Sequence, residues 1–184
     1  NLHENFIDDK NVDVINFSSD RLSINSLSTT DNATLTLAGQ FRTNNINLLS
    51  GQLIVGGSAL ELSNFDVNVN QQGGSFTGAI VNEPVTLPPG EDFSFLGAAV
   101  SAGSEELTNL SIARKNNEVV TLDNSRSIEV IWDINVDQPT FSARTLTLTW
   151  DASLDGENNF EGGSEAYIWK SDDEGQTWNF YDTG

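Results

Sequence analysis

Hydrophobic and polar residues alternate with a period of two along much of this chain, and clusters of glycine, asparagine and serine interrupt the alternation. A period of two places successive side chains on opposite faces of a β-strand, whereas a helical face repeats every three or four residues. The pattern therefore predicts an all-β fold. The first 30 residues contain short strand candidates at 12–15 and 22–24.

Between residues 30 and 80, apolar residues recur in pairs whose two members are separated by one residue. The pairs are Ile46/Leu48, Leu53/Val55, Leu60/Leu62 and Val67/Val69, and they begin seven residues apart. Glycines between the pairs would each weaken a helix by about 1 kcal/mol, and the i, i+2 spacing marks one face of a strand. Three sides of this length would make a coil of about 21 residues, near the lower limit for solenoid repeats. We therefore expect a short right-handed parallel β-helix here, with a β-meander as the alternative.

Pro84 and the run Pro88-Pro89-Gly90 mark a change of pattern, because adjacent prolines do not fit inside a central strand. We expect a domain boundary here, with residues 1–83 forming the solenoid-like region and residues 84–184 a second domain. Beyond the boundary, longer strand candidates lie at 93–100, 107–114, 119–122, 128–136, 145–150, 166–171 and 178–181. Their number and spacing predict an immunoglobulin-like antiparallel β-sandwich. The apolar faces of 128–136 and 146–150 should contribute to its core.

The C-terminal tail contains an acidic turn between aromatic residues. Ser171, Asp173, Gly175, Thr177 and Trp178 form the pattern S-x-D-x-G-x-T-W. Asp173 is expected to accept hydrogen bonds from backbone N–H groups of its own hairpin, and Gly175 to adopt a positive φ. Ser171 should help to close the loop, and the Trp178 ring should lie on the core. These roles shape the backbone, and none of them is catalytic.

This pattern resembles the Asp-box of sialidase propellers and of many other extracellular β-proteins. The segments Leu96–Val100, Ile112–Lys115, Ile128–Ile134 and Leu146–Asp151 resemble the β-sandwich of large surface proteins and adhesins of Bacteroidetes. The resemblance covers roughly residues 85–184. It implies a sandwich that follows β-helical repeats, with export by the type IX secretion system through a separate C-terminal sorting domain. No sorting domain is visible here, so either it was removed or the chain is an internal segment.

A second acidic loop carries oxygen-bearing side chains at alternate positions, namely Asp155, Glu157, Asn159 and Glu161. Carboxylate and amide oxygens are the ligands that Ca²⁺ prefers. The loop is therefore a candidate calcium site, although its offsets do not fit an EF-hand. The alternative is a solvated hairpin loop. Calcium is the one cofactor that the sequence suggests.

Tyr167 and Trp169 alternate with Ala166 and Ile168, and parity alone does not say which pair faces solvent. An exposed aromatic pair would offer flat apolar faces to a sugar ring. Tyr167 and Trp169 are therefore candidate glycan-binding residues.

The amino-acid composition excludes several classes of function and binding partner. The chain has no cysteine, which excludes disulfides and thiol catalysis, and it has 27 acidic against eight basic residues, a net charge of −19. Nucleic acid and anionic membranes would repel such a chain, and divalent cations would be attracted. No apolar run is long enough to span a membrane, and no signal peptide or methionine is present, which suggests processing or a segment of a longer protein.

Together these features predict a non-enzymatic extracellular segment of a bacterial cell-surface or filament-forming protein, with a structural or adhesive role. Its expected partners are other copies, other surface proteins or glycans. The alternative is a carbohydrate-binding module of a secreted polysaccharide-degrading enzyme. A sialidase is not expected, because this chain has one Asp-box and five scattered arginines, whereas sialidases carry several boxes and an arginine cluster.

Overall fold

The computed structural model describes residues 15–16, 22–29, 34–39, 41–57, 60–62, 69–71, 74–122, 125–137, 142–158, 160 and 165–183. These residues form β-strands and one short 3₁₀ helix, with no α-helix among them, which confirms the all-β class. No helix in this part of the chain is long and apolar enough to cross a membrane. Val67, Asn159 and Glu161, which carry sequence predictions, lie outside the described residues.

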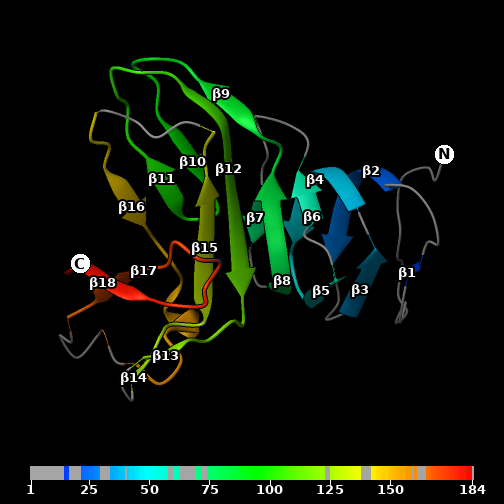
Figure 1. Ribbon diagram of the computed structural model, residues 1–184. Coiled ribbons are helices and arrows are strands. Elements are labelled where there is room, and N and C mark those ends of the chain that lie inside the picture. The colour runs from blue at the N-terminus through cyan, green and yellow to red at the C-terminus, as the bar shows by residue number, and fades with distance from the viewer. Residues whose placement is uncertain are drawn as a thin grey trace.

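Strands of the N-terminal part pair in parallel and form two stacks (Figure 1). The strands are β1 (Ile15–Asn16), β2 (Leu22–Thr29), β3 (Thr34–Gly39), β4 (Phe41–Leu48), β5 (Gln52–Gly57), β6 (Leu60–Leu62), β7 (Val69–Gln71) and β8 (Ser75–Asn82). The first stack contains β1, β3, β5 and the start of β8. The second contains β2, β4, β6 and the end of β8, and β7 also pairs with β4. From β1 to β6 the chain therefore alternates between the two stacks.

Partners within a stack are about one predicted coil apart in sequence. Thr34 pairs with Gln52 and Gln52 with Ser75, which are offsets of 18 and 23 residues. The expectation of three seven-residue sides is wrong, because β4 begins at Phe41, seven residues before Leu48, and so is longer than one expected side with its turn. No glycine or proline lies between these two residues to break the strand.

Members of the apolar pairs whose side chains the structure describes are buried and belong to one core cluster. Buried members are Ile46, Leu48, Leu53, Val55 and Leu60. The pairs Ile46/Leu48 and Leu53/Val55 occupy positions i and i+2 of β4 and β5, so both side chains of each pair leave the same face. The prediction that the two members of a pair share one face of a strand is confirmed for these two pairs.

The strands of the C-terminal part of the chain pair antiparallel. Its elements are β9 (Val85–Leu87), β10 (Phe93–Phe95), β11 (Ala98–Val100), β12 (Leu107–Asn116), β13 (Thr121–Leu122), β14 (Ser125–Arg126), β15 (Val130–Asn135), β16 (Leu146–Leu148), the 3₁₀ helix η1 (Ala152–Leu154), β17 (Tyr167–Lys170) and β18 (Asn179–Thr183). β12 pairs with β15, β8 and β9, and β10, β11 and β16 form a second sheet. β13–β14 and β17–β18 are two-stranded ribbons.

Strand β8 joins the parallel and antiparallel parts. Residues 78–81 of β8 pair antiparallel with residues 113–116 of β12, and Figure 1 shows these two strands side by side in the middle of the molecule. One cluster of buried side chains continues across this junction, and it includes Leu35, Phe76, Leu87, Phe93 and Ile112. Hydrogen bonds and apolar packing therefore both cross residues 83 and 84, where the sequence predicts a domain boundary. The division into two domains stays a prediction.

The polar side chain of Asn82 fills the gap where β8 ends and β9 begins. Its Oδ1 accepts a hydrogen bond of 2.6 Å from the Ile112 N–H, and its Nδ2 donates to the Leu110 carbonyl over 3.2 Å. Pro84 has no N–H to offer to β12. The asparagine thus bonds backbone groups of β12 where the pairing of this strand passes from β8, at Ala113, to β9, at Leu110.

The prediction of one strand at 93–100 is wrong, because these residues form a hairpin of β10 and β11. Leu96 and Gly97 both have positive φ values, 45° and 85°, which suits a tight two-residue turn. A Cβ on Gly97 would lie 2.1 Å from the Thr149 carbonyl oxygen, so only glycine fits. The Leu96 carbonyl accepts a 3.0 Å hydrogen bond from the Trp132 indole, which holds the turn against the facing sheet.

Part of the predicted sandwich core is also wrong. Val130 is buried, and Trp132, Ile134 and Leu148 are partly buried against the core cluster, as expected. However, Val136 and Leu146 are 38% and 45% exposed. Val136 lies beyond the end of β15, and Leu146 begins the short strand β16, which pairs with β11 alone among the described strands.

Gly78 lies where β8 passes from the first stack to the second, and substitution there should destabilise the fold strongly. Its φ is +91°, and an added Cβ would lie 2.1 Å from the Val55 carbonyl oxygen. Gly78→Ala should therefore lower the free energy of unfolding by more than about 2 kcal/mol, measured by urea denaturation. Gly90→Ala is the matched control, because Gly90 has φ +85° with nothing near the added Cβ. It should cost only about 1 kcal/mol, and equal losses in the two variants would contradict this account.

Candidate functional site

The C-terminal hairpin carries most of the residues that the sequence singles out. Tyr167 pairs with Thr183 and Lys170 with Asn179, and a register shift lies between Ile168 and Trp169. The ribbon makes no strand pairing with any other described strand. An isolated two-stranded ribbon is marginally stable in water, so its connecting turn has to be well determined.

The turn is held by the side chains of Ser171 and Asp173. The Ser171 hydroxyl accepts hydrogen bonds from the N–H groups of Asp173 and Gly175, at 3.3 and 2.8 Å, and donates to Asp173 Oδ1 over 2.8 Å. The two oxygens of Asp173 accept from the Thr177 N–H at 2.8 Å and from the Thr177 hydroxyl at 2.7 Å. Both carboxylate oxygens are therefore engaged by the turn itself.

Two residues of this turn adopt positive φ values, 58° for Glu174 and 84° for Gly175. The Trp178 indole N–H donates to the Gly175 carbonyl over 3.1 Å, and the ring lies 3.7 Å from the position of a Cβ on Gly175. Trp178 is half-buried and is not part of the described core cluster. The indole thus folds back over its own turn, where the sequence predicts packing on the core.

Hydrogen bonds lower the pKa of Asp173. The largest contribution comes from the Thr177 side chain, followed by the Thr177 N–H and the Ser171 hydroxyl. Donors that favour the ionised form keep the carboxylate charged. An acid that stays ionised and fully engaged is suited to shaping a backbone, and it is a poor proton donor.

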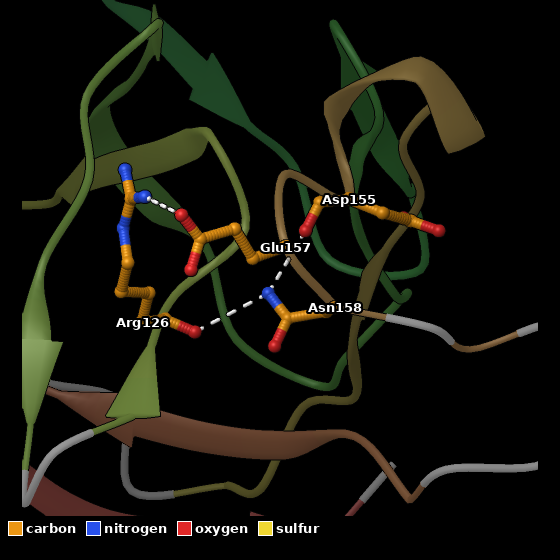
Figure 2. Close-up of polar contacts among 4 residues, drawn as sticks. All are labelled: Arg126, Asp155, Glu157 and Asn158. Atoms are coloured by element: carbon orange, nitrogen blue, oxygen red, sulfur yellow. Dashed lines mark hydrogen bonds and ion pairs between the residues drawn. The ribbon is translucent and has the colours of Figure 1, made fainter.

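The predicted calcium loop places its two described acids apart (Figure 2). Glu157 forms an ion pair with Arg126. Asp155 Oδ1 instead accepts a 2.7 Å hydrogen bond from the Trp150 indole, and its side chain points away from Glu157. Asn158 bridges the loop by donating to the carbonyls of Asp155 and Arg126.

These contacts tie the loop to the β13–β14 ribbon. Within the part of the chain that the structure describes, no three His, Cys, Asp or Glu side chains gather as a metal-binding group. Asn159 and Glu161, the other two predicted ligands, lie outside the described residues. The calcium site therefore stays a prediction, and calorimetric titration with Ca²⁺ tests it.

The predicted glycan-binding residues lie on β17, on the face that contains Phe180. Tyr167 is 59% exposed and Trp169 is half-buried. The Phe180 ring contacts both, with centroid distances of 6.2 Å to Tyr167 and 6.0 Å to Trp169. Sequence analysis missed Phe180, although the pairing of an aromatic strand 178–181 with 166–171 across a short turn could have indicated it.

Two arginines elsewhere, the buried Arg114 and the half-buried Arg144, hold the backbone of the antiparallel part. Arg114 donates to Asn116 and to the Leu96 carbonyl, and its guanidinium lies 5.8 Å from the ring centres of both Phe76 and Trp132. Desolvation by burial lowers the pKa of Arg114, and the charge of Asp151 opposes this effect. These contacts assign Arg114 to packing between the two parts of the fold.

Arg144 clamps the loop after β11. Its guanidinium donates to the carbonyls of Ser101 and Glu105 and lies against Gly103. Its Nε is buried without a hydrogen-bond partner. Two carbonyl contacts on the terminal nitrogens fix the guanidinium in this orientation.

No protein-family model, curated protein or solved structure matches this chain. The resemblance to Bacteroidetes surface proteins therefore has the support of the quoted residues alone. Function has to be inferred from the geometry.

Asp173→Asn tests the role of this carboxylate in the turn. Because the folded pKa is lowered, the ionised form stabilises the hairpin fully above the unfolded pKa of about 3.9, and this stabilisation is lost as the pH falls through the lower folded value. Asp173→Asn should therefore weaken the hairpin at pH 7, with a difference from wild type that disappears in strong acid. Protection of the Thr177 amide, followed by NMR, reports this difference.

Asp172→Asn is the matched control for this experiment. It removes only the exposed ion pair between Asp172 and Lys170 and should change the Thr177 amide little. An equal loss of protection in both variants would show that the negative charge of the turn, and not the hydrogen bonds of Asp173, stabilises it.

Proposed function

We propose that this chain is a non-enzymatic structural and adhesive segment of a bacterial cell-surface or filament-forming protein. In this proposal, the parallel stacks are coils of a short right-handed β-helix that leads into an immunoglobulin-like β-sandwich, and the Asp-box turn closes the last hairpin. The observation that carries the proposal is the shared strand β8, which hydrogen-bonds to β5, β6 and β12. A continuous hydrogen-bonded frame of this kind transmits force between its two parts.

The spacing of the parallel partners supports the β-helix. Offsets of about 20 residues between successive partners, such as Leu22 with Phe41 and Leu60 with Ile80, are those of small solenoid repeats. Inward apolar pairs on successive strands give each coil a share of one core. The net charge of −19 keeps such a rod soluble and keeps rods apart.

The acidic turns support a structural role. Asp173 serves its own backbone, Glu157 pairs with Arg126, and Asp155 binds the Trp150 indole. Each of these carboxylates already has a partner that orders a loop. Other copies or other surface proteins are the proposed partners, and extracellular display is the proposed location.

The second candidate function is that of a carbohydrate-binding module, and the exposure of Tyr167 on the hairpin favours it. Sugar rings stack best on aromatic faces that lie flat and open. The Phe180 ring stands at 60° to Tyr167 and at 81° to Trp169. These rings do not form one flat platform, so the structural and adhesive role is the better supported proposal.

Labelling of intact producing cells tests the location. An antibody raised against this chain should label cells or filaments without permeabilisation, and external protease should remove the signal. A cytosolic marker in the same cells controls for leakage. Labelling that appears only after permeabilisation would contradict the proposal, and so would a polysaccharide hydrolase activity that is lost on substituting Asp155 or Glu157.

A further inference from the structure

Three aromatic side chains gather on one face of the β17–β18 ribbon. Trp169 and Phe180 are paired directly across the two strands, and Tyr167 lies two residues before Trp169 on the same strand face. Tyr167 and Phe180 are 59% and 55% exposed, which is unusual for large apolar rings. We call Tyr167, Trp169 and Phe180 the aromatic cluster.

The rings of the aromatic cluster stand at steep angles to one another. Phe180 is tilted by 60° to Tyr167 and by 81° to Trp169, with centroid distances of 6.2 and 6.0 Å. In such contacts the edge of one ring lies near the face of another, and Tyr167 and Phe180 still stay more than half exposed. A cation is attracted to an exposed ring face within about 6 Å of its centre and needs no flat platform of several rings, so these exposed rings suit a cationic group better than a flat sugar ring.

The charge of the hairpin as a whole favours a cation as well. The described hairpin contains five carboxylates, those of Glu165, Asp172, Asp173, Glu174 and Asp182. Its single basic residue, Lys170, is already paired with Asp172. Glu165 accepts a 3.3 Å hydrogen bond from the Tyr167 hydroxyl, which places one carboxylate at the edge of the cluster.

We propose that the aromatic cluster binds an arginine or lysine side chain of a partner protein, with Glu165 supplying the negative charge. The partner is basic, because the hairpin has an excess of negative charge that complements a positive surface. A second copy of this chain is a poor occupant, since each copy has 27 acidic and eight basic residues. This inference names a partner chemistry for the adhesive segment and in that sense rests on the proposed function.

Peptide titration of the full chain tests the inference. The probe is a peptide of alternating arginine and glycine, and its analogue with glutamine in place of arginine is the reference. Binding is followed by calorimetry and by the NMR signal of the Trp169 indole. The arginine peptide should bind and the glutamine peptide should not, and raising the salt to 0.5 M should weaken binding because exposed charges are screened.

Phe180→Leu separates ring chemistry from apolar contact. It keeps an apolar side chain and removes the π face, and it should weaken binding of the arginine peptide about threefold to fivefold. Tyr181→Leu is the matched control, because Tyr181 is 68% exposed on the same strand and joins neither described ring contact. It should leave the affinity unchanged. If Phe180→Leu disturbs the Thr177 amide signal, Tyr167→Leu and Tyr167→Phe replace it. Tyr167→Leu should then weaken binding of the arginine peptide, and Tyr167→Phe should retain it.

Three outcomes would overturn the inference. They are equal binding of both peptides, unchanged affinity in Phe180→Leu and Tyr167→Leu, and binding of a neutral oligosaccharide such as xylohexaose that depends on the same rings. The last outcome would assign the cluster to glycans. The titration uses purified protein, so its result is independent of the cell-labelling experiment, and either proposal can fail without the other.

Discussion

The fold depends on the backbone hydrogen bonding of one strand, β8. Its first residues extend the first parallel stack, its last residues extend the second, and residues 78–81 also pair with β12. This requires a bend at Gly78, where φ is +91° and the chain passes close to the Val55 carbonyl. The exposed edge of a parallel stack would otherwise offer unpaired N–H and C=O groups. Pairing with β12 covers part of this edge and starts the antiparallel part.

Buried polar side chains complete the junction that β8 creates. Asn82 satisfies the Ile112 N–H and the Leu110 carbonyl where β8 gives way to β9. Arg114 lies between the rings of Phe76, on β8, and Trp132, on β15. A buried cation without hydrogen bonds would be costly, and Arg114 reduces this cost by donating to Asn116 and to the Leu96 carbonyl. Through these contacts Asn82 and Arg114 link β8, β12 and β15 at the junction.

The sequence was sufficient for the strands and for the direction of the apolar pairs, because a period of two records which side chains leave the same face. It was insufficient where the backbone leaves that regular pattern. Leu96 adopts a positive φ, which a leucine side chain does not indicate in the sequence, so the hairpin at 93–100 was predicted as one strand. The number of sides per coil depends on whether the chain bends between Phe41 and Ile46, and no residue there marks or forbids a bend. At the candidate site, the motif was enough to predict the Asp-box turn. The ring angles around Phe180 and the ion pair of Glu157 with Arg126 could not be predicted, because they depend on contacts between segments that are separated in sequence.

The central claim is that β8 makes the parallel and antiparallel parts one cooperative unit. Native-state hydrogen exchange tests this claim most directly. Amides of β5, β8 and β12 should exchange with the same free energy of opening, equal to that of global unfolding, and should respond equally to low concentrations of urea. The C-terminal hairpin should open at lower free energy, because no described strand pairs with it. If the amides of β5 and β8 instead open together well before those of β12, the two parts fold independently and the account is contradicted.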